Sequence, residues 1–366
     1  MTGPSTGPSG TLGGTTTGAT TGATTGATTG AASSATTGAA SDAASVAEVA
    51  EVAGHVLDAV ATAVVGQQRS LRLAVAAVLA GGHVLLEDVP GTGKTLAARS
   101  LAAALGLEFR RLQCTPDLLP ADVTGSFVYD PGRAEFVFHP GPVMAGLLLA
   151  DEINRTPPKT QSALLEAMQE GQVTVEGRTF ALPRPFHVLA TANPVEYEGT
   201  YPLPEAQLDR FLVRLAFGYP GTELETAVVS RRLRRRQETV DVPPVIDAAG
   251  LRRLQAGVEQ VDVDPDVVAY AVDLVAATRA HQQVEVGASP RGSLALVLVA
   301  RALAVVDGRD VVLPEDVKAV AVPALAHRLT LAPETWSTGV SGVDVVTELL
   351  GRVPGPATRR SVAPAP

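Results

Sequence analysis

The chain has 366 residues, of which 46% are hydrophobic and 18% charged, with a net charge of −9. This length suits two folded domains and a tail, and the acidic balance argues against broad binding to nucleic acid or anionic membranes. The single cysteine, Cys114, excludes an internal disulfide. No arginine or lysine precedes Arg69, and charged or glycine residues interrupt the longest apolar runs, so we expect a cytoplasmic protein with no transmembrane segment.

The first segment, residues 1–44, is almost wholly Gly, Thr, Ala, Ser and Pro, with a recurring Thr-Thr-Gly-Ala tetrad. It has too few large apolar side chains to offset the entropy of ordering. We predict a disordered tail without a catalytic role.

The next segment, residues 45–220, begins with a helix whose apolar residues recur at helical spacing from Val46. Apolar strands then alternate with helices, which predicts a parallel sheet with helices on both faces. Two hairpin insertions are expected, at Gly125–Phe138 and Gln172–Leu182. The predicted strands span residues 84–87, 108–113, 146–150 and 187–191, and the predicted helices span 67–80, 96–105 and 158–170.

Residues 221–350 show helical patterns joined by Pro and Gly turns, with few strand signals. They predict an all-α domain, followed by a Pro-rich flexible tail over residues 351–366. The predicted helices span residues 223–237, 247–258, 264–281, 293–306 and 314–326.

A phosphate-binding loop is predicted where Pro90-Gly91-Thr92-Gly93-Lys94-Thr95 joins a strand to a helix. Backbone N–H groups and the helix N-terminus would face an anion, Lys94 would reach the outer phosphates, and the Thr95 hydroxyl could hold Mg²⁺. Asp88 stands at the first glycine position of the motif, so we expect its side chain to turn away from the phosphates. The alternative is an ordinary glycine-rich turn.

An acidic pair, Asp151 and Glu152, ends the apolar run Leu147–Ala150. Asp151 could hold Mg²⁺, and Glu152 could orient and deprotonate the water that attacks the γ-phosphate. Without the phosphate loop, this pair alone would indicate little.

Asn193 ends the run Val188–Ala192 and would lie beside the acids if the two strands are neighbours. There it could hold the attacking water. It could also be a turn-forming Asn before Pro194.

Three arginines could stabilise the charge of the transition state: Arg210, Arg291 and, less strongly, Arg214. We expect Arg210 and Arg291 to lie just outside helical segments. Each could instead be a surface ion-pair partner.

These motifs resemble the AAA+ ATPases, and residues 112–125, 147–170 and 198–211 resemble the MoxR branch closely. The resemblance implies a P-loop NTPase of the α/β class: an AAA+ core over residues 45–220 and a helical lid over 221–350. It assigns Asn193 to sensor 1, Arg210 to the arginine finger and Arg291 to sensor 2. Cys114 and Ala192 depart from the family pattern, which usually has an aromatic residue and glutamine there. The residues expected to bind nucleotide are Gly66, Gln67, Pro90, Gly91, Thr92, Gly93, Lys94, Thr95 and Leu96.

The resemblance also implies Mg²⁺-dependent ATP hydrolysis in a ring of identical subunits, expected to be a hexamer, with sites at subunit interfaces. Such proteins look like chaperones that remodel a partner, often one with a von Willebrand factor A domain. Whether Arg291 serves its own nucleotide or a neighbour's stays open. Three alternatives also stay open: a chelatase-type ATPase subunit, a slow nucleotide-gated scaffold, and a nucleic-acid motor using the basic run Arg231–Arg236, which is otherwise a solvated helix face.

Overall fold

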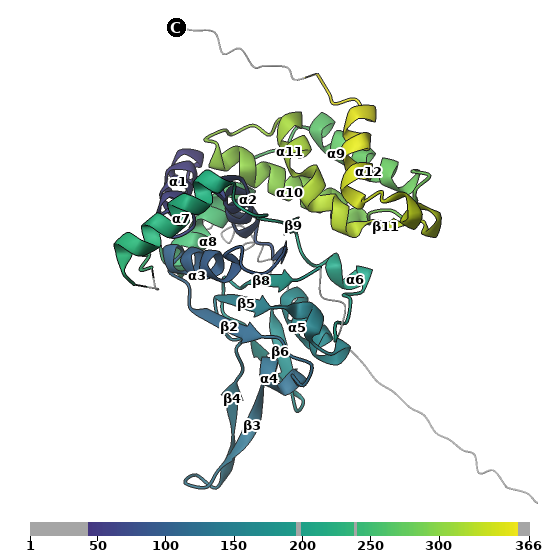
Figure 1. Ribbon diagram of the computed structural model, residues 1–366. Helices are drawn as coiled ribbons and strands as arrows, with labels where there is room; N and C mark the ends of the chain where they lie inside the picture. Colours follow the sequence, from purple (N-terminus) through teal and green to yellow (C-terminus); the bar gives the residue numbers. More distant parts are fainter. Residues whose placement is uncertain (1–42, 195–198, 238–239, 358–366) are drawn as a thin grey trace, which may run out of the picture. The chain divides into compact units, whose positions relative to one another are not determined.

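The computed structural model describes residues 43–194, 199–237 and 240–357, except for the side chains of residues 336–338 (Figure 1). These residues belong to one compact unit, so the domain boundary placed near residue 220 stays a prediction. Nearly all of the predicted N-terminal tail, residues 1–42, and the end of the C-terminal tail, residues 358–366, lie outside the described part.

Both tail boundaries need a small correction. Ala44, assigned to the tail, is buried, and its N–H donates to the carbonyl oxygen of Arg253 at 3.2 Å. Residues 351 and 352, also assigned to a tail, form the end of helix α12 (Gly342–Arg352).

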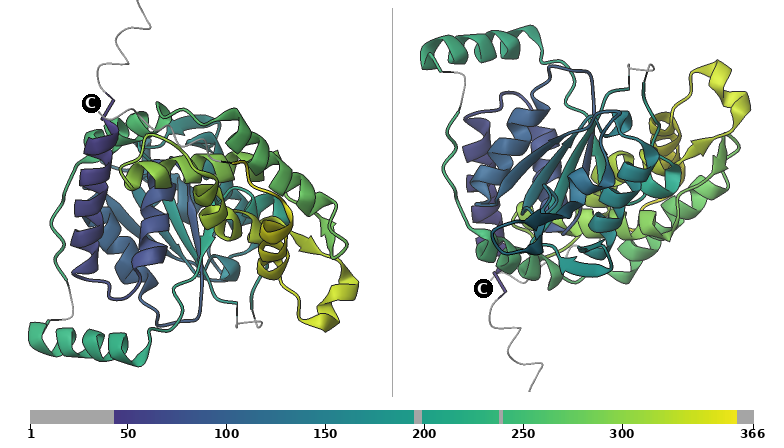
Figure 2. Two further views of the ribbon diagram at one scale, coloured as in Figure 1. Left: turned by 90° about the horizontal axis from the view of Figure 1, so that it is seen from above. Right: turned by 90° about the horizontal axis from the view of Figure 1, so that it is seen from below.

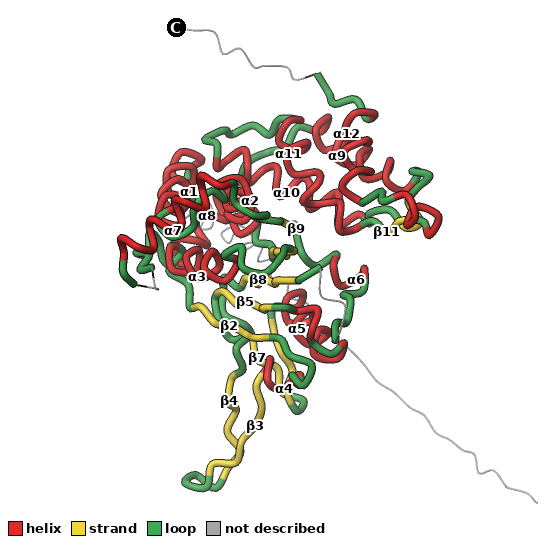
Figure 3. The backbone as a smooth tube through the Cα atoms, viewed as in Figure 1, coloured by secondary structure: helices red, strands yellow, loops and turns green. Residues whose placement is uncertain are grey.

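A five-stranded sheet forms the centre of the fold, in the order β2-β5-β8-β1-β9, with every pair of neighbours parallel. Four of the strands were predicted, whereas β9 was not. Figure 3 shows β2, β5 and β8 side by side. The strands are β1 (Val84–Glu87), β2 (Phe109–Gln113), β5 (Leu147–Asp151), β8 (His187–Ala192) and β9 (Val213–Leu215).

Successive side chains of β5 enter two different cores, as the alternation along a strand requires. Leu147 and Leu149 pack with the first three helices, while Leu148 and Ala150 pack with α5 on the opposite face. Helices therefore cover both faces of the sheet (Figure 2). These helices are α1 (Val46–Ala61), α2 (Gln68–Leu79), α3 (Lys94–Ala104) and α5 (Pro158–Glu170).

The two hairpin insertions are confirmed. One joins β3 (Gly125–Asp130) to β4 (Glu135–Pro140) and extends away from the central sheet (Figure 1). The other joins β6 (Gln172–Val175) to β7 (Arg178–Ala181) directly after α5. The sequence did not predict the short helix α4 (Pro120–Thr124), which contacts β3 and β6, nor the 3-10 turn η1 (Ile153–Arg155) and the short helix α6 (Glu205–Leu208).

The C-terminal part is helical, as predicted, although helix α12 and a small sheet were not among the predicted elements. A small antiparallel sheet pairs β10 (Val284–Val286) with β11 (Thr330–Leu331), two strands too short to leave a clear sequence pattern. The remaining helices are α7 (Thr222–Arg235), α8 (Ala248–Glu259), α9 (Pro265–Arg279), α10 (Pro290–Val306), α11 (Pro314–Leu325), the 3-10 helices η2 (Ala326–Arg328) and η3 (Pro333–Thr338), and α12.

Helix α7 contributes no buried residue, and the basic run from Arg231 to Arg236 lies in and just after it. Within the described ranges, no helix combines the length and the apolar composition needed to span a bilayer.

Candidate functional site

The predicted phosphate loop connects β1 to α3, and two of its glycines adopt backbone angles that other residues rarely tolerate. Gly91 has φ = 84° and Gly93 has φ = 88°, in the left-handed region where a Cβ is disfavoured. Gly93 caps α3, and Lys94 is the first residue of that helix. The loop thus has the sharp curvature that an anion-binding turn needs.

The Lys94 side chain folds back over the loop. Its Nζ donates to the carbonyl oxygens of Asp88 at 2.6 Å and Val89 at 3.1 Å. Burial lowers the pKa of Lys94, and the nearby carboxylates of Asp88, Asp151 and Glu152 oppose that shift. The ammonium group therefore lies in a partly desolvated place where a phosphate would be a strong partner.

Asp88 turns away from the loop, as the sequence predicted. One carboxylate oxygen accepts the N–H of Val89 at 2.8 Å, and the other accepts those of Phe217 at 2.8 Å and Gly218 at 2.7 Å. The side chain thereby fixes the base of the loop to the segment after β9.

Asp151 lies at the end of β5, within reach of the loop. Its Oδ2 is 3.4 Å from the Thr95 hydroxyl, which donates to it, and its Oδ1 accepts a 2.6 Å hydrogen bond from the Thr191 hydroxyl. Oδ2 also accepts hydrogen bonds from Arg111, through Nε at 3.1 Å and Nη2 at 2.6 Å. The two predicted Mg²⁺ ligands, Thr95 and Asp151, therefore lie next to each other.

Glu152 is one of the few residues other than glycine with a left-handed backbone, at φ = 60°. Such conformations are costly and cluster at functional sites. Its N–H donates to the Thr191 hydroxyl at 2.8 Å, and its Oε2 accepts from Gln113 at 3.2 Å and Arg155 at 3.0 Å. The chain thus bends at Glu152, directly after β5 ends at Asp151.

Asn193 does lie beside the acids, because β5 and β8 are neighbours. Its carbonyl oxygen accepts a 3.2 Å hydrogen bond from Asn154. One cavity of about 160 Å³ brings together most of the predicted catalytic and phosphate-binding residues. It is lined by Pro90, Gly91, Lys94, Thr95, Asp151, Glu152, Thr191, Ala192 and Asn193.

The two residues expected near the adenine lie elsewhere. Gly66 lines a separate cavity of about 540 Å³ with Leu224 of α7, and a Cβ at Gly66 would come within 2.6 Å of that leucine. Gln67 is buried at the start of α2. Their role in binding the base stays a prediction.

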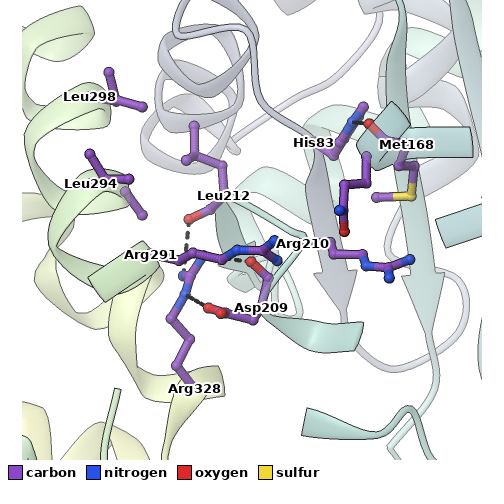
Figure 4. Close-up of a pocket in the computed structure, with 11 residues that line it drawn as sticks. His83, Met168, Asp209, Arg210, Leu212, Arg291, Leu294, Leu298 and Arg328 are labelled. Atoms are coloured by element: carbon purple, nitrogen blue, oxygen red, sulfur yellow. Dashed lines mark hydrogen bonds and ion pairs between the residues drawn. The ribbon is translucent and has the colours of Figure 1, made fainter. Parts of the chain in front are cut away.

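Arg210 and Arg291 line a third cavity, of about 230 Å³, and neither lines the phosphate cavity (Figure 4). Arg210 follows α6, outside a helix as predicted, but Arg291 lies inside the first turn of α10 rather than before it. Arg214 forms an ion pair with Glu87 at 2.8 Å.

Several polar residues line part of the third cavity. Arg328 forms an ion pair with Asp209 at 2.7 Å, and Asp209 also accepts a 2.9 Å hydrogen bond from Ser289. His83 lines the same cavity, and burial, helped by the neighbouring His187, lowers the pKa of His83 to about 4. Asp209, the residue before Arg210, is therefore held by two polar contacts.

Four residues around the acids were missed by the sequence analysis: Arg111, Gln113, Arg155 and Thr191. A usable signal existed for Arg111 and Gln113, since polar residues two apart near the end of a strand share one face. Thr191 gave no such signal, because threonine is common in strands. Cys114, by contrast, is buried as expected, and burial raises the pKa of its thiol to about 11.

Comparisons with known proteins agree with this geometry. Residues 83–213 match the family described as ATPase family associated with various cellular activities (AAA), and residues 276–349 match the AAA lid domain. The protein YeaC of Bacillus subtilis is 48% identical over 310 residues, covering 84% of this chain and 96% of YeaC. The chaperone MoxR1 of Mycobacterium tuberculosis is 44% identical over 304 residues, covering 79% of this chain and 78% of MoxR1. A crystal structure from Cytophaga hutchinsonii, of a protein assigned as an ATPase, has a TM-score of 0.79 at 39% identity and covers 84% of this chain and 96% of its own.

Proposed function

The chain belongs to the MoxR family of AAA ATPases, and on that premise we propose that it hydrolyses ATP with Mg²⁺ in a ring of identical subunits, expected to be a hexamer, to remodel partner proteins. The observation that carries the proposal is the 3.4 Å contact between the Thr95 hydroxyl and Asp151 Oδ2, in a cavity that Lys94 also lines. A phosphate-binding loop and a carboxylate-tipped strand therefore meet at one place.

The donor atoms fit Mg²⁺. A hydroxyl and a carboxylate oxygen are hard ligands of the kind this cation prefers, and nucleotide-bound Mg²⁺ usually takes only one or two protein ligands. Within the part of the chain that the structure describes, no group of three or more His, Cys, Asp and Glu forms a ready-made metal cage. Thr95 and Asp151 would hold Mg²⁺, which supplies charge neutralisation at the phosphates when bound.

We assign the other steps of hydrolysis to the remaining residues of the cavity. Lys94 and the backbone N–H groups of the loop would bind the phosphates, and Glu152 would accept a proton from the attacking water. Asn193 would orient that water from the neighbouring strand. Glu152 would first have to release Gln113 and Arg155, because both now donate to its Oε2.

The positions of Arg210 and Arg291 support a ring. Both line a cavity other than the phosphate cavity, so each is free to serve the nucleotide of a neighbouring subunit. An arginine supplied by a neighbour is worth roughly 10³ to 10⁵ in rate in comparable enzymes. Each site would then be complete only after assembly. The cytoplasmic location stays a prediction.

Glu152→Gln tests the hydrolytic role directly. The amide keeps the size of the side chain but cannot accept the proton, so we expect nucleotide binding to persist while phosphate release is lost. Equal phosphate release from the variant and the wild type would contradict the assignment of the base. A scaffold that works by nucleotide binding alone would not depend on this residue.

The same variant provides a trap for the client. A ring held in its ATP-bound state should retain its partner, and we propose a protein with a von Willebrand factor A domain. Affinity capture with Glu152→Gln in ATP, compared with capture in ADP, identifies the partner. Enrichment of nucleic acid or of a chelatase subunit instead would favour those alternatives.

A further inference from the structure

We propose that Arg111 is a displaceable counterion of Asp151, which competes with Mg²⁺ for one carboxylate oxygen and so sets how strongly Mg²⁺ and nucleotide reinforce each other's binding. This inference rests on the proposed function, because it concerns the same metal and nucleotide site. It gives a role to a residue that the sequence analysis did not single out.

Only one carboxylate oxygen of Asp151 is available to a metal ion. Oδ1 accepts a 2.6 Å hydrogen bond from the buried Thr191, so it is committed to fixing the carboxylate. Oδ2 is the atom nearest the Thr95 hydroxyl, the other predicted metal ligand, at 3.4 Å. A cation shared by Thr95 and Asp151 therefore needs Oδ2.

Arg111 occupies that same oxygen. Its Nε lies 3.1 Å and its Nη2 2.6 Å from Oδ2, so two donors of the guanidinium converge on one acceptor. Such charge-assisted contacts neutralise the carboxylate when no other cation is close. Oδ2 faces both Arg111 and Thr95. Mg²⁺ bound to Oδ2 and a full ion pair between Oδ2 and Arg111 therefore oppose each other.

The Arg111 side chain is exposed enough to leave Asp151. β2 is an edge strand, and the side chain of Arg111 is 46% exposed, compared with 11% for Asp151. A half-exposed guanidinium can turn into water at small cost, and ion pairs of this kind usually shift an equilibrium by no more than about fivefold. The contact is therefore strong enough to compete with the metal but too weak to exclude it.

Arg111 also reaches the predicted base indirectly. Its Nη2 donates to Gln113 Oε1 at 2.7 Å, and Gln113 Nε2 donates to Glu152 Oε2 at 3.2 Å. When Arg111 leaves Asp151, it can also release Gln113. Occupation of the metal site would thereby loosen one of the restraints on Glu152.

The neighbouring Arg110 offers a matched control. It lies on the same edge strand with its side chain 57% exposed, but it pairs with Glu108 at 2.8 Å instead of with Asp151. Adjacent residues of a strand face opposite sides. Arg110→Met and Arg111→Met therefore remove the same charge from the same strand, and only the second removes the contact with Asp151.

The experiment measures the affinity of the full-length protein for a fluorescent ADP analogue, once with Mg²⁺ and once with EDTA. We expect the ratio of the two affinities to rise about twofold to fivefold in Arg111→Met and to stay at the wild-type value in Arg110→Met. Without Arg111, an unneutralised Asp151 weakens binding in EDTA, and Mg²⁺ no longer has to displace a cation. Arg111→Lys, which keeps the charge but not the forked contact, should give a smaller rise.

The outcomes separate the inference from the proposed function. If Arg111 only stabilises the pairing of β2 with β5, Arg111→Met will lower the melting temperature without changing the affinity ratio relative to Arg110→Met. That result would overturn the inference. If Arg111→Met fails to fold, the ratio is measured in Arg111→Lys. A ratio equal to that of the wild type in Arg111→Lys would then also overturn the inference. A wild-type chain that binds no nucleotide in either condition would remove the proposed function together with the inference.

Discussion

Thr191 links the two acids of the candidate site through one hydroxyl group. It donates to Asp151 Oδ1 at 2.6 Å and accepts the N–H of Glu152 at 2.8 Å. The sequence could not predict this contact, because it depends on the register in which Ala150 of β5 pairs with Ala190 of β8, next to Thr191. The local environment of the predicted base and metal ligand therefore depends on tertiary structure.

Thr191→Val should disturb both acids while keeping the branched shape of the side chain. The partly buried N–H of Glu152 would lose its acceptor, which costs up to about 1–3 kcal/mol of folding free energy. Loss of a residue that orients a metal ligand typically lowers activity about 10- to 100-fold. Steady-state phosphate release and thermal melting measure the two effects, and Thr191→Ser, which keeps the hydroxyl, should restore most of the activity. Full activity in the valine variant would show that the hydroxyl is dispensable.

Among the strands, those of the central sheet with four or more residues were predicted, whereas the strands of two or three residues were missed. β5 and β8 are buried at every position, and their sequences are nearly continuous apolar runs, as expected for strands covered on both faces. β9 has three residues with Arg214 in the middle, and it forms because β1 offers a free parallel edge. β10 and β11 likewise exist only as each other's partners.

The candidate site was also predictable only in part. The residues of the phosphate loop and the strand ends were predictable because each motif is contiguous in sequence. Arg111 and Thr191 were not, because their roles depend on pairing between strands far apart in the chain. The direction of Asp88 was predictable from charge alone, but its partners after β9 were not.

The two hairpins are joined by aromatic side chains, and this contact gives a prediction at the same scale. Phe138 of β4 stacks on Phe180 of β7 with ring centroids 3.9 Å apart and an interplanar angle of 9°. Aromatic pairs contribute about 0.5–1.5 kcal/mol beyond the area they bury. In Phe138→Ala we therefore expect amide hydrogen exchange in β6 and β7 to become up to roughly tenfold faster.

Phe136 is the matched control for that measurement. It lies two residues from Phe138 on the same strand, its side chain is 67% exposed, and its ring contacts Tyr129 of its own hairpin, with centroids 5.4 Å apart. Phe136→Ala should leave exchange in β6 and β7 unchanged. Equal acceleration in both variants would mean that the whole β3–β4 hairpin had loosened, and the proposed link through Phe180 would be wrong.

In the molecule as a whole, the predicted catalytic residues lie in two separate cavities, which supports the proposed assembly. Lys94, Asp151 and Glu152 share one cavity, whereas Arg210 and Arg291 share another. In the proposed ring, Arg210 of one subunit would complete the hydrolytic site of its neighbour. A ring of identical subunits provides that arrangement at every interface.

Mixing two inactive variants tests this arrangement. Lys94→Ala should abolish phosphate binding in its own subunit, and Arg210→Ala should abolish the contribution to the neighbour's site, so each variant alone should be inactive. In a random equal mixture, a site is complete when its owner carries the Arg210 change and its neighbour the Lys94 change. That combination occurs at about a quarter of interfaces, so we expect about a quarter of wild-type phosphate release. Recovery should disappear below the concentration at which the ring dissociates, measured by light scattering. If assembled mixtures of variants that melt like the wild type recover no activity, Arg210 acts within its own subunit or not at all.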